Sequence, residues 1–122
     1  MDVISSSGYY PIGDWDRQLD RIEAVVHREG KPFFFMEAGA MSTEGSQYLP
    51  NSWALAGAVS QEAQRDWYEA MFAACDGRDW VGGWMLWAWK ARLYLLDAAA
   101  TDPAYALYDK LAEATVAERY PR

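Results

Sequence analysis

The sequence has little of several residue types, and each shortage excludes a class of protein. Cys75 is the only cysteine among 122 residues, so neither an internal disulfide nor a cysteine-rich metal site can form. No metal-ligand spacing or phosphate-binding glycine loop is present either, and we expect no metal and no cofactor. No apolar run approaches the roughly 18 residues of a membrane-spanning helix. The first residues also lack the basic and apolar regions of a signal peptide, so the protein is either cytoplasmic or secreted with an N-terminus that precedes this chain.

Basic residues are also scarce. The chain has 11 Lys and Arg against 18 Asp and Glu, which gives a formal net charge of −7. The basic residues form no cluster, and this argues against binding to nucleic acid or to anionic membranes. We therefore expect a neutral ligand.

Aromatic residues are abundant. Seven Trp and eight Tyr occur in a chain that is 52% hydrophobic, which is more than a core of this size usually needs. Because Trp and Tyr combine a flat apolar face with a hydrogen-bonding edge, we expect some of these rings to face a ligand.

Strand-like and helix-like segments alternate along the chain. The strands are expected at residues 3–9, 31–37 and 81–87, and helices are expected to start after Asp14, Ser60 and Asp102. Each helix has an apolar stripe at helical spacing: Trp15, Leu19, Ile22 and Val26; Trp67, Met71, Ala74 and Cys75; Tyr105, Tyr108, Ala112 and Val116. The order βαβαβα predicts an α/β domain over residues 1–122 with a parallel sheet.

Two irregular stretches, residues 38–59 and 90–101, follow the second and third strands. In α/β barrels the loops at the carboxyl ends of the strands carry the active site. Three βα units cannot close an eight-stranded barrel, which typically needs about 250 residues. The chain is therefore either part of a longer barrel, which we favour, or a unit of which two copies complete a sheet.

Glu37 ends the apolar second strand. By strand alternation it should share a face with Phe33 and Phe35. A carboxylate at the end of a buried strand either accepts hydrogen bonds from the next loop or takes part in a reaction, because burying it unpaired is costly. Both readings fit the sequence at this point.

The run GKPFFFMEAGAMS, from Gly30 to Ser42, resembles the seventh strand of clan A glycoside hydrolases, which are retaining enzymes on a TIM barrel. The sequence at both ends of this run is similar to one member of the clan, the β-mannanase family 113. Asp2 to Ile12 resembles its sixth strand, Val81 to Trp89 its eighth strand, and Tyr108 to Glu113 its closing helix. In the intervening helix Gln64, Trp67 and Tyr68 also match. The resemblance implies the C-terminal portion of the barrel, strands six to eight with their helices.

Carried over position by position, the resemblance implies that Glu37 is the nucleophile and that Tyr9 orients it. Trp87 or Trp89 would form the floor under the sugar, with Tyr10 nearby as a further substrate-binding residue. Tyr9 and the tryptophans also have structural explanations, since strand alternation sends at least one of Trp84, Trp87 and Trp89 into the core. The clan's acid/base carboxyl comes from the fourth strand, which this chain lacks, so the chain alone is expected to be inactive.

The expected substrate is a β-linked polysaccharide or oligosaccharide. The expected protein partner is the missing N-terminal barrel portion or a second copy of the chain. A non-catalytic carbohydrate-binding or assembly module derived from such a barrel is the alternative function. His27, in the last turn of a helix, is expected to be solvated, and Cys75 is expected to be a buried structural thiol.

Overall fold

The computed structural model describes residues 2–92, 95 and 97–120. Its elements are β1 (Ile4–Ser7), α1 (Trp15–Glu29), β2 (Phe33–Ala38), α2 (Gln61–Cys75), β3 (Val81–Leu86), a 3₁₀ helix (Ala98–Thr101) and α3 (Leu111–Arg119). The three strands form a parallel sheet in the order β1-β2-β3. This is the α/β fold with parallel strands that the alternating pattern predicts.

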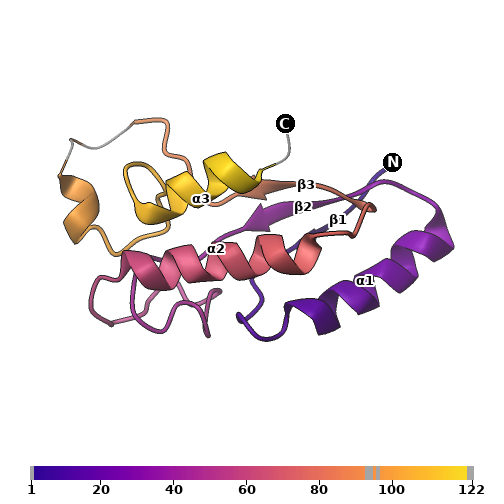
Figure 1. Ribbon diagram of the computed structural model, residues 1–122, viewed down its shortest axis with the longest axis horizontal. Coiled ribbons are helices and arrows are strands. Elements are labelled where there is room, and N and C mark those ends of the chain that lie inside the picture. Colours follow the sequence, from indigo (N-terminus) through magenta and orange to yellow (C-terminus); the bar gives the residue numbers. More distant parts are fainter. Residues whose placement is uncertain (1, 93–94, 96, 121–122) are drawn as a thin grey trace.

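The helices cover one face of this sheet (Figure 1). The core lies between the two layers and contains Trp15, Leu19, Phe33, Phe35, Trp67, Met71 and Leu107, all at most 2% exposed. The opposite face carries no helix formed by the described residues, and there Met36 and Met85 are 49% and 61% exposed. Among the described residues, β1 and β3 each have a neighbouring strand on one side only, and a strand edge of this kind can pair with a further strand.

α1 and α2 form where the sequence predicts them, with differences at their ends. Gly30 terminates α1 in the left-handed conformation at φ 61°, which glycine adopts without steric cost. The Ser60 side chain accepts a hydrogen bond from the Ala63 amide at the start of α2, as predicted. Asp14 precedes α1, but its side chain makes no capping bond. Its carboxylate pairs with Arg17 instead, at 2.7 Å.

β2 contains an irregularity that changes where Glu37 points. Phe33 and Phe35 are buried under the helices, and simple alternation would place Glu37 with them. The register with β1 shifts between Ser6 and Ser7, so that Ser7 pairs with Glu37 and Met36 has no partner in β1. Glu37 is exposed. The predicted shared face is therefore wrong, because an extra residue in a strand re-aims the side chains that follow it.

The predicted helix from Asp102 is also wrong, since residues 102–110 are irregular and α3 begins at Leu111. The backbone carbonyls of residues 102 to 106 accept hydrogen bonds from the side chains of Ser42, Thr43 and Gln64. These tertiary contacts replace the bonds of a helical turn. Ala112 and Val116 are buried on α3 as predicted, whereas Tyr105 and Tyr108 precede it. The predicted irregular stretch 90–101 includes residues 93–94 and 96, which lie outside the described residues, and its last four residues form the 3₁₀ helix.

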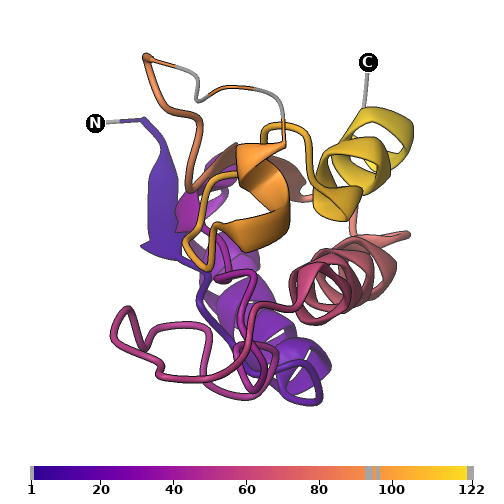
Figure 2. The same ribbon diagram turned by 90° about the vertical axis from the view of Figure 1, so that its left-hand side faces the viewer.

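The carboxyl ends of all three strands meet at one end of the molecule, which faces the viewer in Figure 2. The segments 39–59 and 97–110 gather there beside Tyr9, just past the end of β1. This end is where a parallel α/β sheet binds its ligands. None of the helices formed by the described residues is long and apolar enough to cross a membrane.

Candidate active site

Glu37 and Tyr9 meet at the carboxyl ends of β2 and β1. The Tyr9 hydroxyl donates a hydrogen bond to Oε2 of Glu37 at 3.2 Å. The backbone joins the same two segments, since the Gly8 amide donates to the Glu37 carbonyl at 2.7 Å. The two predicted catalytic residues are therefore adjacent, although they are 28 positions apart in the sequence.

Tyr9 keeps its proton at this position. Partial burial raises the pKa of the phenol well above its usual value, and the negative charge of Glu37 and the hydrogen bond to it raise the pKa further. Because the group stays protonated, it remains a hydrogen-bond donor to the carboxylate. The Tyr105 ring packs edge-on against the Tyr9 ring, with the ring centroids 6.3 Å apart.

The three tryptophans of the β3 region differ in burial, and, as expected, one of them lies in the core. Trp84 is buried and packs edge-on against Phe72 of α2 and against Tyr120. Trp87 and Trp89 lie past the end of the strand and are 50% and 49% exposed. They are thus available at the end of the sheet that carries Glu37.

Gly39 lets the β3 loop approach β2. The Trp87 amide donates to the Ala38 carbonyl at 2.8 Å, and a Cβ atom at Gly39 would overlap the Trp87 carbonyl oxygen. The Glu-x-Gly pattern at positions 37 and 39 therefore has a steric reason. It brings Trp87 next to the strand that carries Glu37.

Tyr10 lies against the core. Its ring packs edge-on against Trp15 at 5.0 Å and against Phe35 at 6.4 Å. Its backbone carbonyl accepts a hydrogen bond from the indole of Trp67 at 2.7 Å. These contacts are structural, and the predicted role of Tyr10 in substrate binding stays a prediction.

Three side chains of α2 hold the strand ends in place, a role that the sequence did not reveal. Gln64 donates to the carbonyl of Ala40 at 3.0 Å, Trp67 donates to that of Tyr10, and the Tyr68 hydroxyl donates to that of Trp87 at 3.2 Å. One helix thus fixes the segments that follow β1, β2 and β3. The sequence did contain one signal for this role. Gln64 lies one helical turn before Trp67 and Tyr68, on the face of the helix that is expected to be buried, and a buried side-chain amide must find hydrogen-bond partners.

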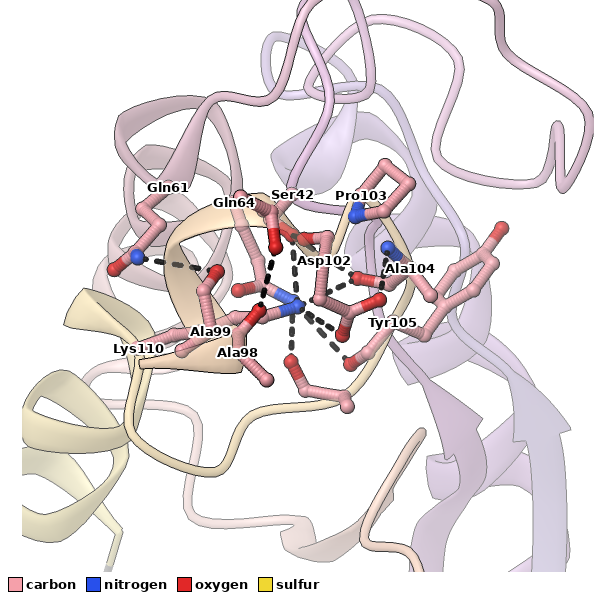
Figure 3. A network of polar contacts seen from close by, with 12 residues as sticks. Ser42, Gln61, Gln64, Ala98, Ala99, Asp102, Pro103, Ala104, Tyr105 and Lys110 are labelled. Atoms are coloured by element: carbon pink, nitrogen blue, oxygen red, sulfur yellow. Dashed lines mark hydrogen bonds and ion pairs between the residues drawn. The ribbon is translucent and has the colours of Figure 1, made fainter. Parts of the chain in front are cut away.

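A second polar network fastens residues 102–110 to the loop after β2 (Figure 3). The Lys110 ammonium is fully buried and donates to Ser42 Oγ at 2.8 Å, Asp102 Oδ2 at 2.9 Å and the Ala104 carbonyl at 3.0 Å. Three acceptors match the three donors of an ammonium group. Burial alone would raise the Asp102 pKa, but hydrogen bonds from Lys110 and the Ala104 amide, with the charge of Lys110, lower it. The network positions Tyr105, which packs against Tyr9.

Two further predictions concern residues away from this site. Cys75 is buried, as expected, and burial raises the pKa of its thiol to about 12. His27 lies in the last turn of α1 with a side chain that is 66% exposed, also as expected. Within residues 2–92, 95 and 97–120, no three His, Cys, Asp or Glu side chains are placed to hold a metal ion.

In α/β barrels the active site lies at the carboxyl ends of the strands, which is where Glu37 and Tyr9 meet in this sheet. Comparison with known proteins shows the family of the chain. The sequence profile of Glycoside Hydrolase Family 113 matches residues 1–110. The chain belongs to this family, and its fold is consistent with part of a TIM barrel.

Solved structures support the assignment. A structure described as a GH113 β-1,4-mannanase is 52% identical, with a TM-score of 0.95 over 98% of this chain and 39% of that one. The GH113 β-mannanase from Alicyclobacillus acidocaldarius is 43% identical, with a TM-score of 0.92 over 97% of this chain and 38% of that one. A Bifidobacterium dentium β-glucuronidase, at 23% identity and a TM-score of 0.65, covers 99% of this chain and 22% of its own, and it shares the fold alone. No curated protein sequence matches the chain.

Proposed function

We propose that this chain supplies the nucleophile part of a retaining glycoside hydrolase that cleaves β-1,4-linked mannan-type glycans. The observation that carries the proposal is the hydrogen bond from Tyr9 to Glu37 at the carboxyl ends of two adjacent parallel strands. The two similar structures described as β-mannanases provide the substrate class. The chain spans about 39% of the length of the first of them. We assign it to strands six to eight of the barrel.

Each of the proposed site residues has its own role in the reaction. The Glu37 carboxylate attacks the anomeric carbon, the bond to the leaving oxygen breaks, and a glycosyl-enzyme ester forms. Water then hydrolyses the ester and restores the carboxylate. The hydrogen bond from the Tyr9 hydroxyl holds the Glu37 carboxylate in one orientation. Trp87 and Trp89 provide apolar faces on which the sugar can rest.

A retaining glycosidase needs a second carboxyl group about 5–5.5 Å from the nucleophile. We place this acid/base in the part of the barrel that lies outside the chain, on the fourth strand, as in the clan that the sequence resembles. The leaving group would then receive its proton from a residue that this chain does not carry. The chain by itself is therefore expected to turn over little or no substrate.

The uncovered face of the sheet suits a protein partner. Met36 and Met85 are exposed on it, and the outer edges of β1 and β3 have no neighbouring strand among the described residues. Exposed strand edges and large apolar side chains together favour further strands on both sides. We propose the N-terminal barrel portion as this partner, with a second copy of the chain as the alternative. With a net charge of −7 we propose neither nucleic acid nor a membrane surface.

The half-exposed Trp87 and Trp89, in a chain that carries only the nucleophile, also fit a second function. A carbohydrate-binding module derived from a barrel would use the same aromatic faces without chemistry. Substitution of Glu37 separates the two functions, because a binding module keeps its affinity when the nucleophile is lost.

The test starts from the natural gene product. Its intact mass and oligomeric state are measured first, and β-mannan hydrolysis is assayed on the same sample. Glu37→Gln should reduce hydrolysis by at least about a thousandfold, as expected for loss of a nucleophile, while thermal stability stays unchanged. Glu44→Gln, in the exposed loop after β2, is the matched control and should keep full activity. Equal activity of Glu37→Gln and the natural sequence would disprove the proposed nucleophile. A folded gene product that contains the rest of the barrel and is still inert would favour the binding module.

A further inference from the structure

Tyr105 lies between Tyr9 and the loops that follow β2 and β3. Its ring packs edge-on against the Tyr9 ring, with the centroids 6.3 Å apart and the two planes at 86°. The residue belongs to the irregular segment 102–110, beside the Lys110 network (Figure 3). The proposed reaction uses Tyr9 and Glu37 and assigns Tyr105 no role of its own.

Both ends of Tyr105 are held by hydrogen bonds. Its backbone carbonyl accepts from the Ala88 amide at 3.1 Å and from the side-chain amide of Gln64 at 3.2 Å. Its hydroxyl donates to the Pro50 carbonyl at 2.6 Å. Burial raises the pKa of this phenol, so the hydroxyl keeps its proton and remains a donor. The ring is therefore fastened to the loop after β3 and to α2 at one end, and to the loop after β2 at the other.

The hydrogen bond that Tyr9 makes is sensitive to the position of its ring. The Tyr9 hydroxyl lies 3.2 Å from Oε2 of Glu37, whereas a hydrogen bond between a hydroxyl and an oxygen is most often about 2.7–2.8 Å long. Because the hydroxyl is at the far end of the ring, a small rotation of the side chain would carry it out of reach of the carboxylate. A neighbouring ring that is itself fastened can oppose such a rotation.

From this geometry we infer that Tyr105 is a positioning residue, whose ring holds the Tyr9 phenol where its hydroxyl reaches Glu37. The inference rests on the proposed function and adds one residue to it. The Tyr105 hydroxyl is already engaged by Pro50, so Tyr105 acts through Tyr9 and not on the sugar. Loss of the Tyr105 ring should therefore slow the reaction only while Tyr9 carries a hydroxyl.

The first experiment measures kcat/KM of the natural gene product with 2,4-dinitrophenyl β-mannobioside. Its leaving group needs no proton, so kcat/KM reports the attack by Glu37. Tyr105→Leu should lower kcat/KM about fivefold, less than the loss of the Tyr9 hydroxyl itself, because a displaced hydroxyl still reaches the carboxylate part of the time. In a Tyr9→Phe background the same substitution should change kcat/KM by less than about twofold, since no hydroxyl is left to position. Tyr105→Phe keeps the ring and should stay within about twofold of the parent.

Tyr120 provides a matched control. Its ring packs edge-on against Trp84 with the centroids 5.6 Å apart, and its hydroxyl donates to the Trp84 carbonyl at 2.8 Å. These are the same two kinds of contact that Tyr105 makes. Tyr120→Leu should lower the urea midpoint and leave kcat/KM unchanged, which separates a loss of stability from a loss of positioning.

A second experiment requires no hydrolysis. The natural gene product is labelled with tyrosine that carries ¹³C at Cζ, the carbon bonded to the hydroxyl, and the NMR signal of Tyr9 is identified by its absence in Tyr9→Phe. Tyr105→Leu should shift the Tyr9 signal, because the hydrogen bond of its hydroxyl changes. Tyr120→Leu should leave this signal in place.

The outcomes separate this inference from the proposed function. Losses that multiply in the Tyr9→Phe, Tyr105→Leu double variant would overturn the inference, because Tyr105 would then act independently of the Tyr9 hydroxyl. An unshifted Tyr9 signal in Tyr105→Leu, or equal losses for Tyr105→Phe and Tyr105→Leu, would also overturn it. Hydrolysis that still depends on Glu37 would leave the function standing in each case. A shifted Tyr9 signal in a protein without hydrolytic activity would support the positioning of Tyr9 and remove the enzyme assignment.

Discussion

The buried Lys110–Asp102 pair gives the sharpest prediction about the loops that carry the site. The Lys110 side chain is 0% exposed, that of Asp102 is 17% exposed, and the two charges are 2.9 Å apart. Replacing Lys110 by Met keeps much of the side-chain volume but leaves the Asp102 carboxylate and the Ser42 hydroxyl without their shared donor. Removing one partner of a buried ion pair costs about 3–5 kcal/mol when the remaining charge stays buried. Asp102 is only 17% exposed and would keep the Ala104 amide as a donor, so we expect a loss of about 3 kcal/mol, the lower end of this range.

This cost is large relative to the stability of a domain of this length, about 6–18 kcal/mol at 0.05–0.15 kcal/mol per residue. Lys110→Met should therefore lower the urea midpoint and reduce the melting temperature by about 10 °C or more. Both are measured on the natural gene product, by circular dichroism during urea unfolding and by calorimetry. Arg28→Met removes an exposed pair with Glu29 and serves as the control, with no resolvable change expected.

A double-mutant cycle tests the reason for the effect. Lys110→Met combined with Asp102→Leu removes both charges. The double variant should therefore lose less unfolding free energy than the two single variants lose together, by a coupling energy of about 1–3 kcal/mol. Two results would refute the reasoning. One is a loss below about 1 kcal/mol for Lys110→Met, and the other is strict additivity of the single variants.

Three further predictions concern the same end of the molecule. Tyr9→Phe removes the hydrogen bond to Glu37 and should lower kcat/KM for β-mannan about tenfold with an unchanged melting temperature; unchanged kinetics would exclude the orienting role. Gly39→Ala forces a Cβ against the Trp87 carbonyl and should cost about 1–3 kcal/mol in urea unfolding, whereas Gly13→Ala, with nothing within 4 Å of the added atom, should be silent. The Asp102 pKa is lowered on folding, so its contribution to stability should be complete above about pH 4 and fall as the pH drops through the lower folded pKa. Urea midpoints between about pH 6 and pH 3 should show this fall, and the decrease should be smaller in Lys110→Met.

Much of the fold follows from local patterns in the sequence. The stripe from Trp15 to Val26 and the run from Phe33 to Phe35 each match an element within a few residues, because burial at period 3.6 or in a continuous apolar run leaves few alternatives. The order of these elements is that of a parallel sheet. It brings Glu37 and Tyr9 to the same end, since parallel strands all finish at one edge.

The stretch after Asp102 shows where local patterns fail. An Asp-Pro pair followed by apolar residues at helical spacing favours a helix, but side chains from distant segments bind the backbone there. Ser42 and Gln64 lie 60 and 41 positions from the carbonyls of Asp102 and Tyr105 that they reach. No window of sequence includes both partners, so propensity predicts an element that tertiary contacts replace.

By itself, then, the sequence determined the parallel α/β order and the family, because each depends on short patterns or on chain order. The candidate pair Glu37 and Tyr9 came from the resemblance to that family. Only the tertiary structure decided the orientation of Glu37, which a register shift against β1 turns away from the buried face of Phe35. It also decided the hydrogen bonds of α2 to the segments that follow the three strands. These features depend on distances between segments remote in the chain, and such distances exist only once the chain has folded.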